Sequence, residues 1–293
     1  DKNLSFMKNI LSQPSNYFYK EISDFTQKNN TRYTGFLPTE ADYSLENYKK
    51  AYEVYKERFA NIGDFEFFFV GNIDGAKLED LATKYLATLP ANTAKEAVVD
   101  TKSRSFMGEH KMVVNKGQDP KSNVIIRFTG ETTYDAKEAL ALSALGEVLT
   151  IKLVEELREN ESGVYGVGAN GSMGKLPYGS YNFQISFPCG PENAEKLTES
   201  ALRELNKMIA EGPSQKDLDK YKEGEILDNK KDLKENKTWL SSLSSSYLND
   251  TNPERILTYE DRVKALTVKE LQDVAKKYLT KNKFIAILMP ETK

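Results

Sequence analysis

The stretch from residue 135 to residue 170 constrains the fold more than any other, because it joins one long apolar helix to a strand through a short turn. Leucines recur there at three- and four-residue steps, at Leu142, Leu145, Leu149, Leu153 and Leu157. This spacing, with apolar residues on both flanks of the stripe, predicts a helix buried in a core. Charged residues and Gly163 interrupt the pattern at 159–163, and residues 164–171 resume it with the period of a strand. The pattern therefore predicts that Arg158 ends the helix and that Tyr165 begins the strand.

Arg158 and Tyr165 are the candidate functional side chains of this stretch. A guanidinium is a fork of fixed hydrogen-bond donors, and a phenol is a donor that stays neutral at physiological pH, so together they suit an oxygen that gains negative charge. Spacing alone leaves a structural alternative open for each residue. Arg158 would then cover the last carbonyls of its helix, where the macrodipole favours a cation, and Tyr165 would be a half-buried strand aromatic.

Residues 109–293 carry the pattern of a complete α+β domain. Strands are predicted at 110–115, 122–129, 164–171 and 180–188 and in the closing FIAILM run. The strand at 180–188 alternates apolar and polar residues and follows a PYG turn, which predicts antiparallel pairing with the strand before it. An amphipathic helix is predicted at 191–211 and a charge-rich surface helix at 214–236. Three more helices are predicted in later segments, the last of which opens with a capping box of Thr267 and Glu270. We therefore expect a mostly antiparallel sheet packed against helices.

Residues 1–90 have the pattern of only part of a second α+β domain. Short helices are predicted at 4–12 and 17–28, and a longer helix is predicted to begin near Ser44, a plausible N-cap. The near-continuous apolar run DFEFFFVGN then predicts a strand buried on both faces, followed by a helix from about Gly75 to Leu89. Residues 91–108 mix small and charged residues without a period, which is typical of an interdomain linker.

An internal repeat relates the two parts of the chain. The segment SLENYKKAYEVYKERFANIGDFEFFFVG, from Ser44, parallels TVKELQDVAKKYLTKNKFIAILMP, from Thr267. Each copy has a Ser or Thr cap, a glutamate in the first turn, a tyrosine eleven residues after the cap (Tyr55 and Tyr278) and then an apolar strand. The second copy is preceded by strands and a core helix, whereas little chain precedes the first. We therefore expect residues 1–90 to be the C-terminal part of a domain that is truncated at its front.

The composition argues against several classes of function. Forty-one Lys and Arg stand against 44 Asp and Glu, so the chain has no basic field for nucleic acid. No run approaches the ~20 apolar residues of a membrane span. With Cys189 as the only cysteine and His110 as the only histidine, the chain has no HExxH, HxxEH or Cys/His cluster for zinc. Cys189 ends a predicted strand and has no evident base, which favours a structural thiol over a nucleophile.

Three longer motifs in the sequence resemble those of a known family: FFFVGNIDGAKLEDLATKYLATLP, LVEELRENESGVYGV and FPCGPENAEKL. With the repeat length, they resemble the insulinase and pitrilysin type of zinc metallopeptidases, over nearly the whole chain. The chain looks most like the C-terminal half of a bacterial member: the end of the third α+β domain, a linker and the complete fourth domain. The resemblance implies that two halves of paired domains close around a peptide. The N-terminal half would hold zinc on an HxxEH helix, and the C-terminal half would supply an arginine and a tyrosine near the scissile bond.

Arg158 and Tyr165 match that pair in type, in order and in their seven-residue separation. The turn between them departs from the commoner pattern, because Glu161 stands where a small or polar residue is frequent. By this resemblance the chain is the substrate-binding half of a zinc metalloendopeptidase, with peptides as substrate and with no cofactor of its own. Zinc is expected in an N-terminal half, which belongs either to the same protein or to a partner subunit. The resemblance is compatible with a soluble protein of the bacterial cytoplasm or periplasm.

A catalytically inactive binding or scaffold subunit is the alternative function, since related folds include subunits without zinc. An HxxEH motif upstream of Asp1 or in a partner would favour the peptidase. An unrelated α+β enzyme centred on Cys189 or His110 is a third possibility, for which the sequence offers no supporting constellation of residues.

Overall fold

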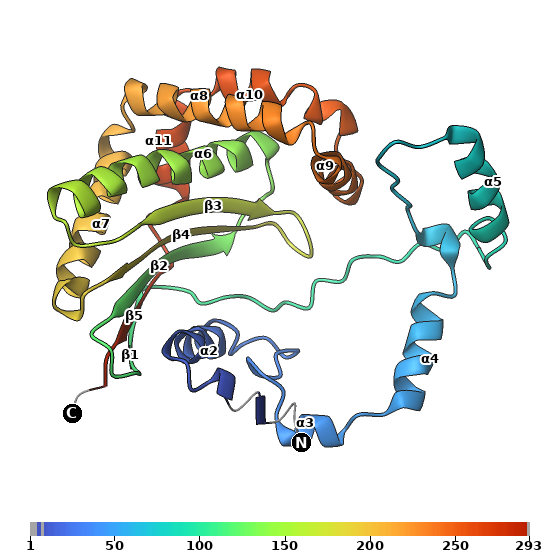
Figure 1. Cartoon of the computed structure of the whole chain (residues 1–293), viewed down its shortest axis with the longest axis horizontal. Coiled ribbons are helices and arrows are strands. Elements are labelled where there is room, and N and C mark those ends of the chain that lie inside the picture. The colour runs from blue at the N-terminus through green and yellow to red at the C-terminus, as the bar shows by residue number, and fades with distance from the viewer. Residues whose placement is uncertain (1–4, 7–8, 292–293) are drawn as a thin grey trace. The chain divides into compact units, whose positions relative to one another are not determined.

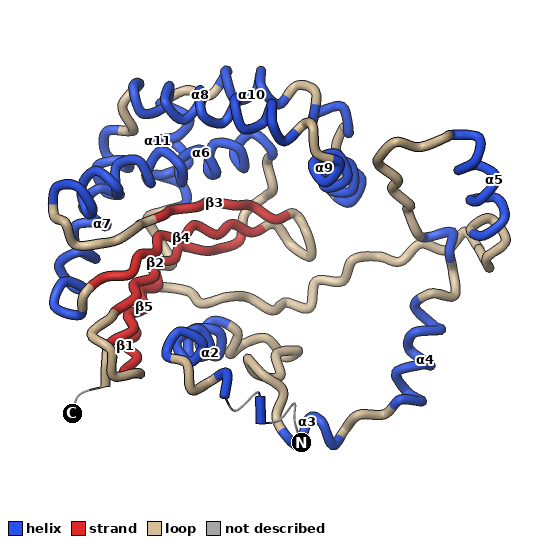
Figure 2. Tube along the Cα trace, viewed as in Figure 1, coloured by secondary structure: helices blue, strands red, loops and turns tan. Residues whose placement is uncertain are grey.

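The computed structural model describes residues 5–6 and 9–291 (Figures 1 and 2). The helices are α2 (Pro14–Thr26), α3 (Glu40–Ser44), α4 (Tyr48–Arg58), α5 (Gly75–Tyr85), α6 (Ala136–Leu153), α7 (Ala194–Glu211), α8 (Gln215–Asp232), α9 (Asn236–Leu248), α10 (Tyr259–Ala265) and α11 (Val268–Tyr278). The strands are β1 (His110–Asn115), β2 (Ser122–Glu131), β3 (Gly168–Gly174), β4 (Ser180–Cys189) and β5 (Lys283–Met289). Single 3-10 turns lie at η1 (Ile62–Asp64), η3 (Pro191–Asn193) and η4 (Pro253–Ile256), and η2 (Val154–Asn160) is a π-helix.

The five strands form one sheet in the order β1-β5-β2-β4-β3. The pairs β2 with β5, β2 with β4 and β3 with β4 are antiparallel, and β1 with β5 is parallel. The C-terminal strand β5 therefore lies inside the sheet, between the first two strands. The predicted α+β class and the mostly antiparallel sheet are confirmed.

Helices α6, α7 and α11 pack on one face of this sheet (Figure 1). All five leucines of the predicted stripe are fully buried. The paired strands β2 and β4 contribute to the buried core Val124, Ile126 and Phe128 from β2 and Phe183, Ile185 and Phe187 from β4. The alternation read from the sequence thus corresponds to the two faces of the strands.

Helix α2 packs on the opposite face of the sheet (Figure 1). Its buried residues Phe18 and Ile22 form a second core cluster with Ile125 of β2 and Phe284 of β5. This explains why Ile125, which breaks the polar alternation of β2, is as deeply buried as its neighbours. The predicted helix at 17–28 is confirmed with a start at Pro14, and the helix predicted at 4–12 lies partly outside the described residues.

The chain divides into two compact units, and each unit is built from segments that are separated in the sequence. The first contains the described residues up to Pro38, Asp100–Glu225 and the chain from Asp261 onward, and so holds the sheet, α2, α6, α7 and α11. The second contains Thr39–Val99 and Ile226–Glu260, and so holds α3, α4, α5 and α9. The domain ranges 1–90, 91–108 and 109–293 remain a prediction.

Three segments of the second unit differ from the sequence prediction. The helix expected near Ser44 begins at Tyr48, because Asn47 is its N-cap and accepts the Lys50 N–H at 3.0 Å. The helix expected to reach Leu89 ends at Tyr85. The buried strand predicted in DFEFFFVGN is wrong for this structure: residues 65–70 have extended coil without strand pairing, and Phe65, Phe67 and Phe69 are exposed. An apolar run shows that a segment can be a buried strand, but burial needs paired neighbours, and the described residues supply none there.

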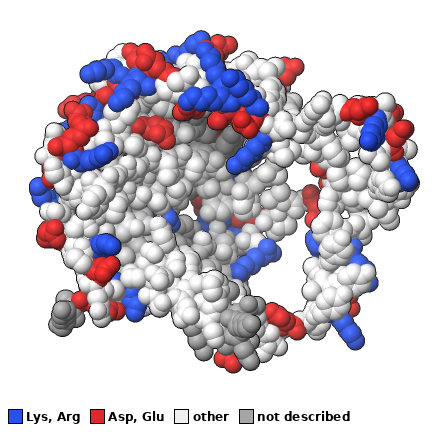
Figure 3. Space-filling view, viewed as in Figure 1, with Lys and Arg blue, Asp and Glu red and all other residues white. Residues whose placement is uncertain are grey.

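Charged side chains of both signs are intermixed over the helices at the top of Figure 3. This face therefore shows no extended basic patch of the kind that binds nucleic acid. Within residues 5–6 and 9–291, none of the helices combines the length and the apolar content that a membrane span requires.

Candidate functional site

The central helix changes its geometry before it reaches Arg158. Asp135 caps α6 by accepting the N–H groups of Lys137 and Glu138 at 2.8 Å, and the α-helical hydrogen bonding continues to Leu153. From Val154 to Asn160 the chain follows a wider π-helix, and the N–H of Glu161 donates to the carbonyl of Glu156, five residues earlier, at 3.0 Å. A π-helix is rare and is found frequently at functional sites. Arg158 lies in this segment with its side chain exposed.

The turn after the π-helix is held against α7. Glu161 pairs with Lys196 at 2.8 Å and with Arg203 at 3.6 Å. Burial acts to raise the pKa of the Glu161 carboxyl, but its bonds to Lys196 and Ser200 outweigh burial and hold that pKa below the usual value. The acidic residue that departs from the commoner family pattern is therefore the anchor of the turn.

Two backbone features complete the path of this turn. Ser162 has a φ of 50°, in the left-handed region that non-glycine residues rarely adopt. The N–H of Gly163 donates to the carbonyl of Leu157 at 2.9 Å, and a Cβ at Gly163 would lie 2.8 Å from the side chain of Leu197 on α7. Only a glycine fits this close approach without movement of the neighbour.

Tyr165 is placed by the residue before it. Val164 is buried and forms an isolated antiparallel bridge with Cys189 at the end of β4. Tyr165 follows in a bend, and 93% of its surface is exposed. The prediction that Tyr165 begins the strand is wrong, since β3 begins at Gly168. The alternative of a half-buried strand aromatic is excluded for the same reasons.

Arg158 and Tyr165 thus lie on the same anchored segment, both on the surface. Within the described part of the chain, neither side chain makes a hydrogen bond, an ion pair or a ring contact, and no such contact joins the two. The structural alternative required Arg158 to bond the last carbonyls of its helix, and the side chain makes no such bond. Their donors face solvent, so an acceptor from outside the chain can reach them. Their role in binding or catalysis remains a prediction.

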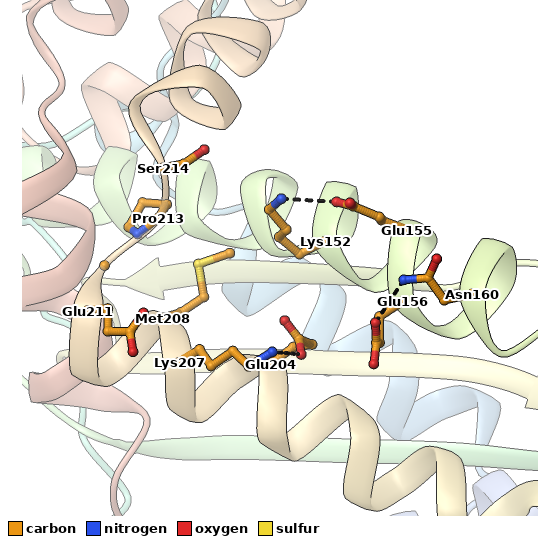
Figure 4. Close-up of a pocket in the computed structure, with 11 residues that line it drawn as sticks. Lys152, Glu155, Glu156, Asn160, Glu204, Lys207, Met208, Glu211, Pro213 and Ser214 are labelled. Carbon is orange, nitrogen blue, oxygen red and sulfur yellow. Dashed lines mark hydrogen bonds and ion pairs between the residues drawn. The ribbon is translucent and has the colours of Figure 1, made fainter.

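A polar pocket of about 520 Å³ lies beside the π-helix, between it, α7 and the turn into α8 (Figure 4). Most of its charged side chains are paired: Lys152 with Glu155 at 3.0 Å and with Asp217 at 3.2 Å, Lys207 with Glu204 at 2.6 Å, and Glu156 with Arg203 at 3.0 Å. Of these pairs, Glu156 with Arg203 joins the π-helix to α7, and Lys152 with Asp217 joins α6 to α8. Sequence reasoning missed both the π-helix and this pocket, because the charges come together only when α7 lies beside α6.

A family model described as the peptidase M16 inactive domain matches residues 46–225. The chain belongs to this family. The resemblance to insulinase and pitrilysin peptidases is thereby confirmed, since these peptidases make up the M16 family.

Individual relatives extend the match in sequence and in structure. The probable zinc protease PqqL of Haemophilus influenzae is 26% identical over 230 residues, which cover 77% of this chain and 24% of the relative. The crystal structure of the periplasmic protease PqqL from Escherichia coli has a TM-score of 0.79 at 21% identity and covers 98% of this chain and 32% of that chain. The peptidase M16 inactive domain from Pseudomonas fluorescens has a TM-score of 0.76 at 17% identity, over 99% of this chain and 69% of that chain. These structures show the same fold, and the chain spans about a quarter of the curated relative it matches.

A zinc site needs several His, Cys, Asp or Glu side chains grouped around one point. Among residues 5–6 and 9–291, no three His, Cys, Asp or Glu side chains are grouped so that they could hold a metal ion. The described residues therefore do not fit a zinc site.

The cysteine and the histidine have structural surroundings. Cys189 is buried, and burial, followed by the nearby Glu192, raises the pKa of its thiol to about 11, so the thiol is protonated at neutral pH. The ring of His110 contacts Phe25 edge-on at 5.0 Å, and its Nε2–H donates to the Met107 carbonyl at 2.7 Å. These contacts give no support to an enzyme centred on either residue.

Proposed function

We propose that this M16 chain is the catalytically inactive, substrate-binding half of a zinc metallopeptidase and acts together with a zinc-bearing half. The observation that carries the proposal is the match to the M16 inactive domain over residues 46–225, joined to an exposed Arg158 and Tyr165 on one anchored turn. The zinc would be supplied by the other half, in the same polypeptide or in a partner. We also propose a periplasmic location, because the E. coli protease with the same fold is periplasmic.

Arg158 and Tyr165 would donate hydrogen bonds to the carbonyl oxygen of the substrate and to the charge that develops on it. Such donors accelerate a reaction only if they meet that oxygen without first reorganising. The bonds of Glu161 to α7 and the bridge of Val164 to β4 limit this reorganisation to the two side chains, since they hold the backbone on both sides of the turn. Removal of one preorganised donor typically costs about 10²- to 10³-fold in turnover, or roughly 2 to 4 kcal/mol.

The test is steady-state peptidase kinetics on the complete protein that contains this chain. Tyr165→Phe removes one donor and keeps the ring, so we expect kcat to fall by about 10²-fold or more with KM little changed. Arg158→Gln is expected to act in the same direction. The two changes affect exposed side chains, so the melting temperature should not move.

Matched controls separate a role in the site from a general effect of surface substitution. Glu159→Gln changes the exposed neighbour of Arg158 in the same π-helix, and Tyr85→Phe removes an exposed phenol in α5. Both should leave kcat unchanged. Unchanged turnover in Tyr165→Phe and Arg158→Gln would defeat the assignment, and a complete protein that hydrolyses no peptide would favour the binding or scaffold alternative.

A further inference from the structure

The face of the sheet opposite α6 is apolar on one side and polar on the other. Helix α2 and the apolar cluster beneath it cover β1, β5 and Ile125 of β2. Arg127 lies two residues after Ile125 and is therefore on the same face of the sheet. Among residues 5–6 and 9–291, the cluster beneath α2 includes none from β3 or β4. The pairing of β2, β4 and β3 gathers six polar side chains there, which we call the polar face: Arg127, Thr129, Asn182, Gln184, Asn170 and Ser172.

Arg127 is the only charged side chain of the polar face. It is half-buried, and its Nε–H and Nη2–H groups donate to Oε1 of Gln184 at 3.2 and 2.8 Å. Within the described part of the chain, Arg127 makes no ion pair and its Nη1 makes no hydrogen bond. The only acidic residue of β2, Glu131, pairs with Arg104 at 2.6 Å. The described residues therefore do not balance the charge of Arg127.

The electrostatics of Arg127 agree with this geometry. Burial lowers its pKa, and the one titratable group that acts against burial is Tyr19 of α2. A phenol carries no charge at neutral pH, whereas a nearby carboxylate would favour the charged form of the arginine. A guanidinium nevertheless stays protonated. Charges that leave water are normally paired, so a half-buried cation without a counter-ion is a candidate binding site.

The free edge of the guanidinium selects the ligand. Gln184 occupies the Nε side of Arg127, which leaves the edge formed by Nη1 and Nη2. That edge matches the two oxygens of a carboxylate. The side chains of Asn182 and Asn170 make no hydrogen bond among the described residues, and each amide can both donate to and accept from a peptide backbone. One cation among neutral amides fits a singly charged carboxylate on a peptide better than a phosphate, which carries up to two charges.

The surroundings of Arg127 determine which carboxylate of a peptide reaches it. Across the sheet, Arg127 pairs with Phe284 of β5 on one side and with Gln184 on the other, and Gln184 pairs with Asn170. Phe284 is fully buried and stacks on Phe25 of α2 at 4.9 Å, whereas Asn170 is exposed. The face is thus closed beyond Arg127 and open towards β3. A peptide that lies across the open strands has to end at Arg127.

We propose that the polar face of this M16 chain binds the C-terminal carboxylate of a peptide, with Arg127 as the anchor. Asn182 and Asn170 bond the peptide backbone, and Gln184 is a positioning residue that holds the guanidinium with its Nη edge free. The proposal rests on the proposed function, from which it takes a peptide as the ligand. It adds a contact that fixes the end of the peptide on a face separate from the turn of Arg158 and Tyr165.

An NMR titration of the 293-residue chain tests this site without turnover. The probes are a short acetylated alanine peptide with a free C-terminal carboxylate, the same peptide amidated, an amidated peptide with an internal glutamate, and inorganic phosphate. The free carboxylate should shift the Nε–H signal of Arg127. Its Kd should be lower than that of either amidated peptide by about tenfold or more, because amidation removes the charge-assisted bonds.

Two variants and a matched control locate the effect. Arg127→Gln removes the cation, so the free-carboxylate peptide should bind no more tightly than the amidated one. Gln184→Glu keeps the shape of the side chain and places a carboxylate against Arg127, so the same loss is expected with the fold retained by circular dichroism. Arg58→Gln removes an exposed guanidinium that pairs with Glu57 and Glu96 on the surface, and affinity should be unchanged.

Four results would overturn the proposal. The first is equal affinity for the free and the amidated alanine peptide, and the second is equal affinity for the amidated peptide with an internal glutamate. The third is tighter binding of phosphate than of the free-carboxylate peptide. The fourth is full affinity in Gln184→Glu. Because the readout is equilibrium binding, Tyr165→Phe should retain it while losing turnover, so a failure here is distinct from a failure of the proposed function.

Discussion

Gly146 provides the sharpest test of how α6 and β3 are held together. This glycine lies inside α6 and faces β3 at very short range. A Cβ built on it would lie 2.8 Å from Cα of Asn170, 3.0 Å from the carbonyl oxygen of Ala169 and 3.0 Å from the N of Gly171. All three atoms belong to the backbone of β3, so no side-chain rotation can relieve the contact. The change to test is Gly146→Ala.

Two opposing effects set the magnitude for Gly146→Ala. Helix propensity alone favours alanine over glycine by about 1 kcal/mol in a helix interior. Overpacking of a core costs typically 1 to 3 kcal/mol, and a clash with backbone falls at about the upper end of that range. The strand cannot yield easily, because the N–H of Ala169 donates to the Thr150 hydroxyl of α6 at 2.8 Å and a shift would stretch that bond. We therefore expect a net loss of about 2 kcal/mol in the free energy of unfolding, which lowers Tm by roughly 4 to 8 °C.

The assay is chemical denaturation of the isolated chain followed by circular dichroism, with Gly224→Ala as the matched control. Gly224 lies in the interior of α8, and a Cβ added there would meet no atom within 4 Å apart from the neighbouring backbone of its own helix. Propensity then acts alone, so Gly224→Ala should stabilise the chain by about 0.5 to 1 kcal/mol. Opposite signs for the two Gly-to-Ala changes are the expected outcome. Stabilisation by Gly146→Ala would refute the close approach of α6 and β3.

Three further predictions concern the turn, the thiol and the C-terminal helix. The lowered pKa of Glu161 means that its carboxylate stabilises the folded state above the ordinary carboxyl pKa and that this stabilisation is lost as pH falls through the lowered value. Glu161→Gln should therefore lower Tm at pH 7, and the difference from the unaltered chain should close as the pH falls through the lowered pKa; a difference that stays constant as the pH falls through the acid range would contradict the ion pair with Lys196. The buried Cys189, with its pKa raised to about 11, should resist iodoacetamide at pH 8 and react at once in denaturant, as mass spectrometry can show; rapid alkylation of the folded chain would refute its burial. Thr267→Ala removes the capping box of α11 and should cost about 1 kcal/mol in urea denaturation, whereas an unchanged midpoint would show that the cap contributes nothing.

Local periodicity in the sequence was sufficient to predict most of the helices and strands of the first unit. The leucine stripe of α6, the alternation of β2 and β4 and the box at Thr267 each concern residues that are close in the chain, and each prediction is confirmed. The family, too, was recognisable from the sequence, because three short motifs carry the resemblance and one of them spans the turn between Arg158 and Tyr165. These features depend on interactions within a few residues, which a linear pattern records.

Contacts between segments far apart in the chain determined the geometry of the candidate site and the burial of the apolar runs. The π-helix, the pairing of Glu161 with α7 and the outward direction of Tyr165 arise only when α6, α7 and β4 are packed together. The apolar runs of β5 and of residues 65–70 look alike in the sequence, yet one is the interior strand of a sheet and the other is exposed. A sequence determines which faces of a segment can be buried, but strand pairing joins residues far apart in the chain, so only the tertiary structure determines whether a partner is there to bury them.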